Sequence, residues 1–484
     1  MSRIEIEVPE PRRWLMFAIL LVGAFLPPLD FFIVNVALPS IQEDLGTGSS
    51  AEQMVISSYA TLYAVTLITG GRLGDLYGRG RMFFLGLLGF AAASLMCGLA
   101  VSPWMLILGR ALQGVTAAVM APQALASVQA IFPVSERPLA LSIYGAVFGL
   151  ASVIGQALGG FLIEVDLLGM GWRAIFLVNL PIALLVIAFG IRVLKETRAQ
   201  HASKLDLVGT ALSMLTLTTL VVPLIEGREA GWPWWAWLSL AASPVLAVVF
   251  WRYENRLHRA GGTPILAPAV LNAPGLGRAL LVALCFYSIG VFFLMFSMYM
   301  QSALHMSALH AGLIFLPFGA GFLLGPLSVP LLRRVLGGYV NPVGMGLEVV
   351  GLLWLGWLVS VTPTTLAPPF TSMTVILFLI GLGQGLGLPT LMRMVTGRVA
   401  PAYAGMIAGI TSATLQISTS LSVALIGGVF YTLLGEPATA VSITHAFTIA
   451  VLCIAVCLAV GAAISLTLAR EPATVAQASA VRPT

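Results

Sequence analysis

Residues 71–101 read GRLGDLYGRGRMFFLGLLGFAAASLMCGLAV. The first eleven are rich in Gly and Arg, and the remaining twenty, 82–101, carry no charged side chain. Twenty residues in a helix cover about 30 Å, which is the thickness of the hydrocarbon layer of a membrane. The stretch therefore predicts a polar turn followed by a membrane-spanning helix.

The same pattern recurs along the whole chain. Of its 484 residues, 59% are hydrophobic and only 9% are charged, which is too little polar surface to cover a water-soluble globule. Runs this long and apolar favour helices over the alternating strands of a barrel, because a helix satisfies its own backbone in lipid. The fourteen predicted spans are 14–38, 52–73, 82–101, 104–127, 139–163, 174–193, 206–225, 234–252, 277–301, 309–332, 342–361, 371–392, 403–431 and 442–468.

The positive charges predict the orientation of these helices. If both termini lie in the cytoplasm, all but three of the 24 Lys and Arg residues fall in cytoplasmic segments, the exceptions being Arg110, Arg173 and Arg228. We therefore expect a multi-pass protein of the inner (plasma) membrane with cytoplasmic termini. The loops account for the net charge of +5, and no basic helix with interleaved aromatics predicts a nucleic-acid partner.

The longest polar connections, 195–205 and 253–277, divide the spans into six, two and six. This division predicts an all-α membrane protein of two six-helix bundles joined by two extra helices. The predicted domains are an N-terminal bundle (1–193), linkers with two helices (194–276), a C-terminal bundle (277–470) and a cytoplasmic tail (471–484).

Cofactor chemistry is not indicated. The four cysteines lie within predicted spans without zinc or redox spacing, so neither a metal nor another cofactor is expected. A Walker A pattern is absent from the sequence, and the polar loops hold no recognisable set of nucleophile, base and third group. An enzyme is therefore a distant alternative, and a membrane sensor that binds ligand without moving it is a further one.

Charged side chains inside the spans are rare, and Asp30, Arg110 and Glu348 are the three that lie clearly within them. Such charges are costly in a bilayer and mark transport pathways or proton relays. Counting residues from the span ends puts Asp30 and Arg110 at similar depth, which allows them to face each other across one bundle. Asp30 is the candidate proton carrier, tuned by Arg110. The alternatives are a structural ion pair or a helix cap for Asp30, and carbonyl hydrogen bonds for Arg110.

Further polar residues are candidates for binding substrate. Glu348 is a candidate for a substrate-binding site or a second proton site. The alternative is that its side chain snorkels or pairs with a polar neighbour. Gln301, Gln384 and Gln416 are candidates to orient a substrate, and the aromatic and Met side chains of span 277–301 offer an apolar lining.

The glycines and charged residues of the loop 71–81 indicate its structural role. Gly71, Gly74 and Gly78 permit close helix approach and a tight turn. Asp75, lying among arginines such as Arg79 and Arg81, can form an ionic latch that holds one access state. This loop resembles the signature of the major facilitator superfamily.

Three more stretches resemble the drug/proton antiporter branch of that family with fourteen helices. They are Leu29 to Ile41 (LDFFIVNVALPSI), Arg110 to Gly114 (RALQG, with Gln113 and Gly114), and Trp172 to Pro181 (WRAIFLVNLP). The resemblance implies proton-coupled drug efflux, and it leaves room for a periplasmic adaptor in a bacterium with two membranes.

Span five carries the glycine-rich pattern that this branch associates with antiport. The residues that match are Gly145, Gly149, Gly155, Gly159 and Gly160, but Gln156 stands where the family has proline. Simple helix packing is the alternative explanation for these glycines.

The sequence predicts a secondary exporter that exchanges small lipophilic or monocationic compounds for protons across the lipid bilayer. Two carboxylates inside spans favour neutral or monovalent substrates over divalent cations. The alternative is a proton-coupled transporter, importer or exporter, dedicated to one metabolite.

Overall fold

The computed structural model describes residues 11–46, 48–133, 136–166, 169–194, 196, 206–229, 231–262, 264, 270, 273–363, 368–399, 404–435 and 437–470. These residues form α-helices with a few 3-10 turns and one π turn, and no strand lies among them. The predicted all-helical fold is confirmed.

The first group of helices is α1 (Arg13–Leu45), α2 (Ser49–Tyr77), α3 (Arg79–Gly98), α4 (Pro103–Ile131), α5 (Arg137–Val165), η2 (Gly171–Arg173), α6 (Ala174–Leu177) and α7 (Asn179–Val193). A hairpin of α8 (Leu207–Glu229) and α9 (Trp234–Arg259) follows. The second group is α11 (Leu276–Phe286), η3 (Tyr287–Val291), α12 (Phe292–Met298), η4 (Tyr299–Ala303), α13 (Ala308–Ile314), α14 (Leu316–Leu336), η5 (Gly337–Tyr339), α15 (Val340–Val361), α16 (Phe370–Thr396), α17 (Ala404–Leu434) and α18 (Ala440–Ala469).

Each predicted span overlaps one or more helices of the structure. By length and hydropathy, eleven stretches of the described residues can cross a membrane, and one of them, Ala308–Val361, contains both α14 and α15. Only shorter apolar segments, Met54–Leu67 and Val208–Leu220, qualify within α2 and α8. The structure thus has many membrane-spanning helices, and the number fourteen stays a prediction.

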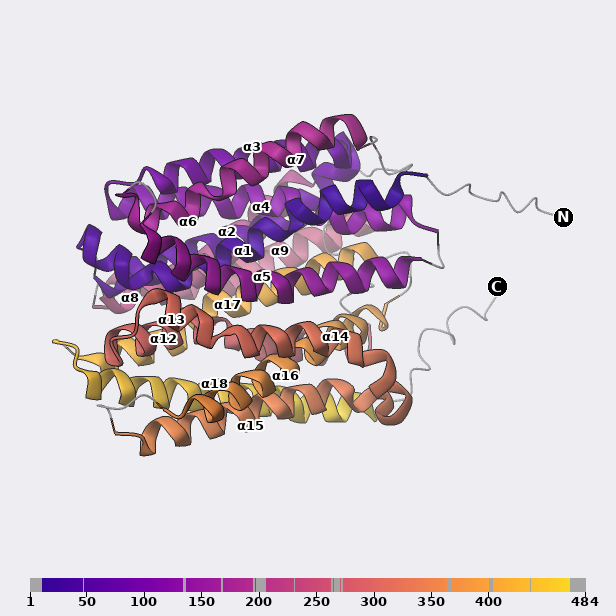
Figure 1. Ribbon diagram of the computed structural model, residues 1–484. Helices are drawn as coiled ribbons and strands as arrows, with labels where there is room; N and C mark the ends of the chain where they lie inside the picture. Colours follow the sequence, from indigo (N-terminus) through magenta and orange to yellow (C-terminus); the bar gives the residue numbers. More distant parts are fainter. Residues whose placement is uncertain are drawn as a thin grey trace.

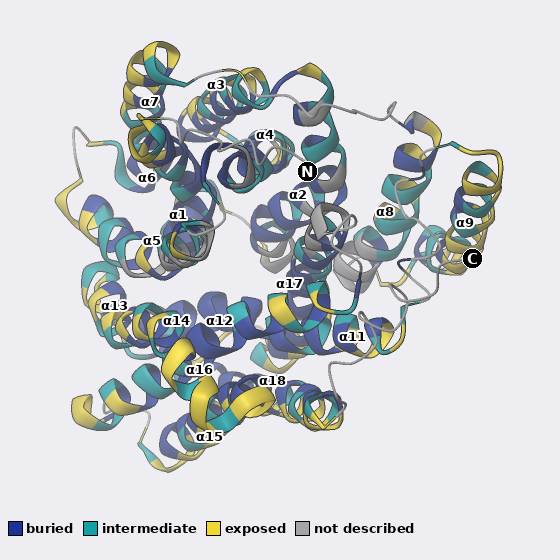
Figure 2. Ribbon diagram, turned by 90° about the vertical axis from the view of Figure 1, so that its right-hand side faces the viewer, coloured by how far each residue is buried: buried dark blue, intermediate teal, exposed yellow. Residues whose placement is uncertain are grey.

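The helices run side by side along one direction (Figure 1). α1 begins and α18 ends at the same end of the molecule, which we call the termini end, and the opposite end is the distal end. Viewed along the helices, α1–α7 form one group, α11–α18 face it as a second group, and α8 and α9 lie beside them (Figure 2). The two groups meet where α2 packs on α17 and where α5 packs on α13 and α14.

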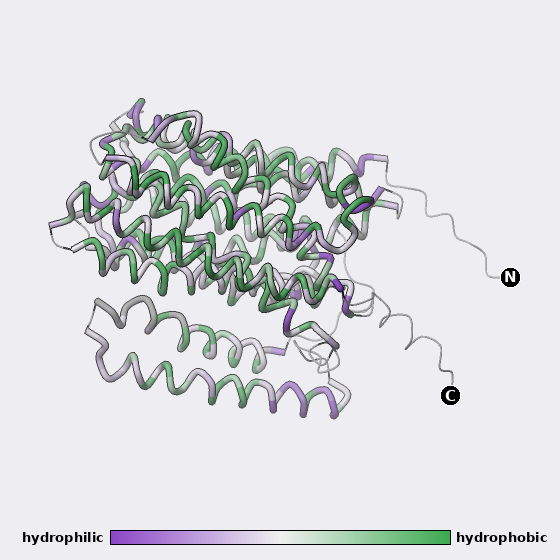
Figure 3. The backbone as a smooth tube through the Cα atoms, turned by 90° about the horizontal axis from the view of Figure 1, so that it is seen from below, coloured by the Kyte–Doolittle hydropathy of each residue, from purple (hydrophilic) through white to green (hydrophobic). Residues whose placement is uncertain are grey.

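The outer surface is apolar along much of its length. Large hydrophobic side chains such as Val335, Phe189 and Trp357 are at least 60% exposed. Hydrophobic segments occupy the middle of the helices, and hydrophilic ones gather toward their ends (Figure 3). This distribution suits a lipid environment, since a water-soluble protein rarely exposes so much contiguous apolar surface.

Candidate functional site

The structure brings Asp30 of α1 and Arg110 of α4 together as an ion pair. Nη1 of Arg110 donates to Oδ2 of Asp30, and neither side chain has any exposed surface. Burying two charges is costly, and further hydrogen bonds to the pair offset part of that cost.

Amide side chains complete the surroundings of Asp30. The Nδ2 of Asn179, from α7, donates to Oδ1 of Asp30 at 2.8 Å, and Nε2 of Gln113, from α4, donates to the same oxygen at 3.0 Å. Gln113 also donates to Oγ of Ser94 at 2.8 Å and accepts from Nη1 of Arg110 at 2.9 Å. These residues form what we call the Asp30 network: Asp30, Ser94, Arg110, Gln113 and Asn179. Three of them, Arg110, Gln113 and Asn179, donate hydrogen bonds to the Asp30 carboxylate.

Arg110 links this network to α2. Its Nε donates to the carbonyl oxygen of Val55 at 2.9 Å, and its guanidinium carbon lies 4.4 Å from the centre of the Tyr59 ring. Such a cation–π contact is strongest where both groups are desolvated. Nη2 of Arg110 has no hydrogen-bond partner within the described part of the chain. Arg110 therefore keeps one donor that can reach a different acceptor.

Local sequence explains how these helices come so close. A Cβ at Gly114 would lie 3.1 Å from the backbone nitrogen of Tyr63, so glycine at this position lets α4 contact α2. Pro27 and Pro28 precede Asp30 in α1 and lack the backbone N–H that a helix uses. The Tyr59 hydroxyl donates to the Pro27 carbonyl oxygen at 3.2 Å, which ties α2 to this part of α1.

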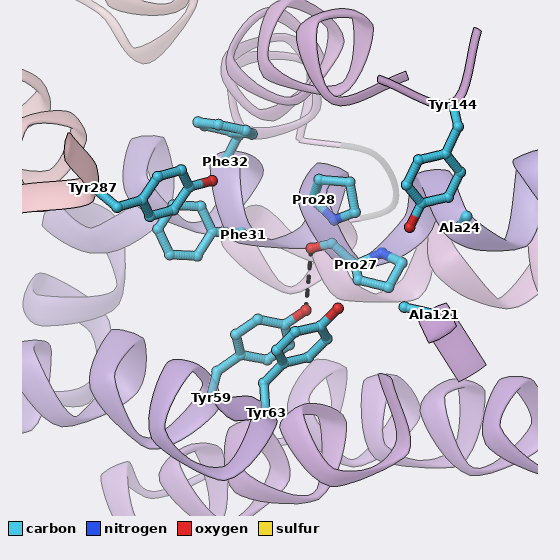
Figure 4. A pocket seen from close by; sticks show the side chains of 10 residues that line it. All are labelled: Ala24, Pro27, Pro28, Phe31, Phe32, Tyr59, Tyr63, Ala121, Tyr144 and Tyr287. Atoms are coloured by element: carbon cyan, nitrogen blue, oxygen red, sulfur yellow. Dashed lines mark hydrogen bonds between the residues drawn. The ribbon is translucent and has the colours of Figure 1, made fainter. Parts of the chain in front are cut away.

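Tyr59, which contacts Arg110, also lines a pocket (Figure 4). We call it the tyrosine pocket, and its lining residues are Ala24, Pro27, Pro28, Phe31, Phe32, Tyr59, Tyr63, Ala121, Tyr144 and Tyr287. All but Tyr287 belong to the first helix group, and Tyr287 reaches in from η3 of the second. The cavity volume is about 30 Å³, whereas drug-sized ligands occupy pockets of about 300–1,000 Å³. In this structure the pocket is therefore too small to hold a substrate of that size.

Glu348 lies elsewhere, within the second helix group. Its side chain is fully buried on α15 against Gly383 of α16. With the Gln384 amide turned so that nitrogen faces the carboxylate, Gln384 donates to the two Glu348 oxygens at 3.2 and 3.1 Å. The structure thus pairs two residues that the sequence had suggested separately, and it places neither of them in the tyrosine pocket.

Of the other two glutamines, Gln301 joins the helix groups near the distal end. Its Nε2 donates to the carbonyl oxygen of Val36 in α1 at 2.9 Å and to Oγ of Ser297 at 2.8 Å. The side chain of Gln416 lies outside the described residues.

The loop between α2 and α3 is held by an acidic residue that sequence reasoning missed. The backbone N–H groups of Gly80 and Arg81 each donate to the Glu196 carboxylate at 3.1 Å, and Nε of Arg81 lies 3.8 Å from it. This carboxylate sits at the N-terminus of α3, where the helix dipole favours negative charge. Gly78 has φ +107°, a conformation that suits glycine.

The rest of this loop packs on α4. A Cβ at Gly74 would overlap the Gln123 side chain, whereas Gly71 is only loosely surrounded. Nη1 of Arg79 donates to the carbonyl oxygen of Ala126 at 3.1 Å. The side chain of Asp75 lies outside the described residues, so the latch expected of it stays a prediction.

The glycines of α5 serve two different interfaces. A Cβ at Gly155 would lie 2.8 Å from Cβ of Phe32, and one at Gly159 would lie 2.9 Å from Cγ1 of Ile33, both in α1. Gly149 packs on the α14 backbone and Gly160 on that of α13, so these two face the second helix group. Gly145 has open space around it, and Gln156 is buried in an uninterrupted helix.

Acidic residues other than Asp30 and Glu348 are also buried. Glu52, Asp206 and Glu254 are buried, and they lie at or beyond the ends of the predicted spans. The helices extend beyond the predicted spans at Glu254, and Glu52 lies at the first turn of α2. The Tyr431 hydroxyl, from α17, donates to Oε2 of Glu52 at 2.6 Å and so joins the two helix groups at the distal end.

Known proteins resemble this chain over most of its length. Residues 20–361 match the family model of the Major Facilitator Superfamily. The probable actinorhodin transporter of Streptomyces coelicolor is 36% identical over 437 residues, which cover 89% of this chain and 75% of the relative. The puromycin resistance protein pur8 of Streptomyces alboniger is 36% identical over 428 residues, covering 87% of this chain and 82% of the relative.

A third relative and a solved structure agree with these matches. The tetracenomycin C resistance and export protein of Streptomyces glaucescens is 32% identical and covers 88% of this chain and 77% of its own length. A structure from a study of substrate recognition in proton dependent oligopeptide transporters shares the fold, with a TM-score of 0.66, 17% identity and coverage of 94% of this chain and 98% of that one. The chain is a membrane transporter rather than an enzyme, and it belongs to the Major Facilitator Superfamily.

Proposed function

We propose that this transporter is a proton-coupled exporter that exchanges small lipophilic or monocationic compounds from the cytoplasm for protons. In this proposal it lies in the inner (plasma) membrane with both termini in the cytoplasm, so the termini end is the cytoplasmic end. The names of three relatives at 32–36% identity refer to transport, resistance or export of antibiotic compounds. These names support export as the direction of transport.

The observation that carries the proposal is the fully buried Asp30 network. Within it, Asp30 is the only acidic residue, and three donors converge on its carboxylate. Protonation of Asp30 removes the charge that balances Arg110, and an unbalanced charge in this surrounding is costly. The protonated protein therefore gains free energy by moving to a conformation in which Arg110 finds another acceptor or Asp30 reaches water.

Tyr59 provides the physical connection between this proton site and the substrate pocket. One face of its ring contacts the Arg110 guanidinium, and the same residue lines the tyrosine pocket. A movement of Arg110 that follows proton binding therefore changes the pocket wall. A ligand that presses on Tyr59 reciprocally changes the affinity of Asp30 for a proton.

The test is the collapse of a respiration-driven pH gradient in everted membrane vesicles on addition of a panel of lipophilic compounds. We expect the wild-type protein to dissipate the gradient with some of these compounds, and Asp30→Asn to abolish the response. Expression of each variant in the vesicles is measured by immunoblot, so that loss of protein is not mistaken for loss of coupling.

Glu348→Gln is the matched control, since it neutralises a second fully buried carboxylate in the other helix group. We expect it to retain the response. Loss of the response in Glu348→Gln together with its retention in Asp30→Asn would move the proton site to Glu348 and contradict the proposal.

A transporter dedicated to one compound is the second candidate. The relatives named above each carry the name of a single compound, which favours narrow specificity. A response to one member of the panel alone would support this candidate and leave the proton site unchanged.

A further inference from the structure

The walls of the tyrosine pocket are aromatic and carry no formal charge. Four tyrosines, two phenylalanines, two prolines and two alanines make up its lining. The rings of Tyr59 and Tyr63, one turn apart on α2, are stacked with their centres 5.9 Å apart and an angle of 22° between their planes. Flat, offset surfaces of this kind favour contact with another planar ring.

The Asp30 carboxylate, which pairs with Arg110 against Tyr59, is not available to a ligand. Both oxygens of Asp30 are already taken by Arg110, Gln113 and Asn179. The guanidinium of Arg110 already occupies one face of the Tyr59 ring. A positively charged ligand would lose its hydration without gaining an unpaired carboxylate in return.

Hydroxyl groups supply the polar character of the pocket. The hydroxyls of Tyr63, Tyr144 and Tyr287 point toward Pro27 and Pro28 from three different helical segments (Figure 4). The Tyr59 hydroxyl already donates a hydrogen bond to the Pro27 carbonyl oxygen. A phenol can both donate and accept a hydrogen bond, so the hydroxyls of Tyr63 and Tyr287 can serve hydroxyl and carbonyl groups on a ligand.

We propose that the tyrosine pocket selects uncharged, planar aromatic molecules that carry hydroxyl or carbonyl groups. This inference rests on the proposed export function, because it takes the pocket to lie on the substrate path. It narrows the substrate class from lipophilic and monocationic compounds to neutral ones. Because Tyr287 belongs to the second helix group, separation of the groups opens the pocket to such a ligand, and their return closes Tyr287 over it.

The experiment measures binding by the purified full-length protein in lipid nanodiscs. The probes are three planar ring systems: a neutral dihydroxyanthraquinone, anthracene, which lacks polar groups, and ethidium, which is cationic. The pH is set so that the anthraquinone hydroxyls stay protonated. We expect the dihydroxyanthraquinone to bind about tenfold more tightly than ethidium, a difference that corresponds to about 1.4 kcal/mol.

Single hydroxyl deletions locate the site. Tyr63→Phe and Tyr287→Phe should each weaken dihydroxyanthraquinone binding by about two- to tenfold, the range for one neutral hydrogen bond, and leave anthracene binding unchanged. Tyr299→Phe is the matched control, since Tyr299 is a buried tyrosine stacked on Phe447 outside the pocket. It should change neither affinity.

Two results would overturn the inference. One is ethidium binding as tight as that of the dihydroxyanthraquinone, and the other is unchanged affinity in both Tyr63→Phe and Tyr287→Phe. Binding requires no proton gradient, so its outcome is separate from the proposed function. If the binding pattern is as expected but the gradient in vesicles does not collapse, only the proposed proton exchange is refuted. If the gradient collapses but the binding pattern differs, only the assignment of the pocket is refuted.

Discussion

Neutralising Asp30 should destabilise the protein strongly, and neutralising Arg110 as well should restore much of the loss. Both side chains are fully buried, and they are the only two charged residues of the Asp30 network. Removing one partner of a buried pair costs about 3–5 kcal/mol, because the other charge stays behind. Asp30→Asn keeps the side-chain volume, so no cavity adds to this cost.

The matching change, Arg110→Met, leaves a carboxylate that still accepts from Gln113 and Asn179. Hydrogen bonds to a charged group contribute about 1.5–3 kcal/mol each, so this variant should lie at the lower end of the same range. The double variant buries no charge in the network. Its loss of unfolding free energy should be smaller than the sum of the two single losses by about 2–3 kcal/mol, which is a large coupling energy for two residues.

The assay is reversible unfolding in mixed micelles, followed by tryptophan fluorescence, for the wild type, both single variants and the double variant. The Arg13 and Glu136 pair provides the control cycle, since its side chains are partly exposed and its coupling should be much smaller. A coupling energy below about 0.5 kcal/mol for Asp30 and Arg110 would refute the reasoning, because contacting partners of a buried pair cannot be independent.

Three further predictions follow from other contacts. Gly155→Ala should destabilise the protein by about 1–3 kcal/mol, since its Cβ would meet α1, whereas Gly145→Ala has open space and should stabilise it by about 0.5–1 kcal/mol in the same unfolding assay. Glu196→Gln should weaken the capping of α3 and speed cleavage of the 77–81 loop by added protease, and unchanged cleavage would argue against this contact. The hydrogen bond from Arg13 holds the pKa of Glu136 below its ordinary value. The stability that this pair contributes is therefore present at pH above that ordinary value and is lost as the pH falls through the lowered pKa. Arg13→Met should remove this acid dependence when the free energy of unfolding is measured against pH.

The central pair could be found from sequence because charge is conspicuous in an apolar helix. Asp30 and Arg110 interrupt long uncharged runs, and residue counting gave them similar depth. The amide partner Asn179 was within a quoted motif but received no role, although a lone asparagine entering an apolar run was a usable signal. Its contact depends on the rotation of α7 against α1, which one sequence does not specify.

Other features depended wholly on packing between helices. Gln384 and Glu348 were both noted, yet their pairing requires the register of α16 against α15. The tyrosine pocket draws on distant segments, and only the spacing of Tyr59 and Tyr63 on α2 is visible locally. Glu196 escaped notice because a single acidic residue in a polar linker looks like an ordinary solvated charge.

Transport by the purified protein in proteoliposomes tests the central claim most directly, using a compound that collapses the gradient in vesicles. Two activities are measured: accumulation driven by an acidic lumen, and exchange of labelled for unlabelled compound without a pH gradient. If Asp30 carries the proton, Asp30→Asn loses the driven accumulation and keeps the exchange. Accumulation by Asp30→Asn equal to that of the wild type would contradict the account.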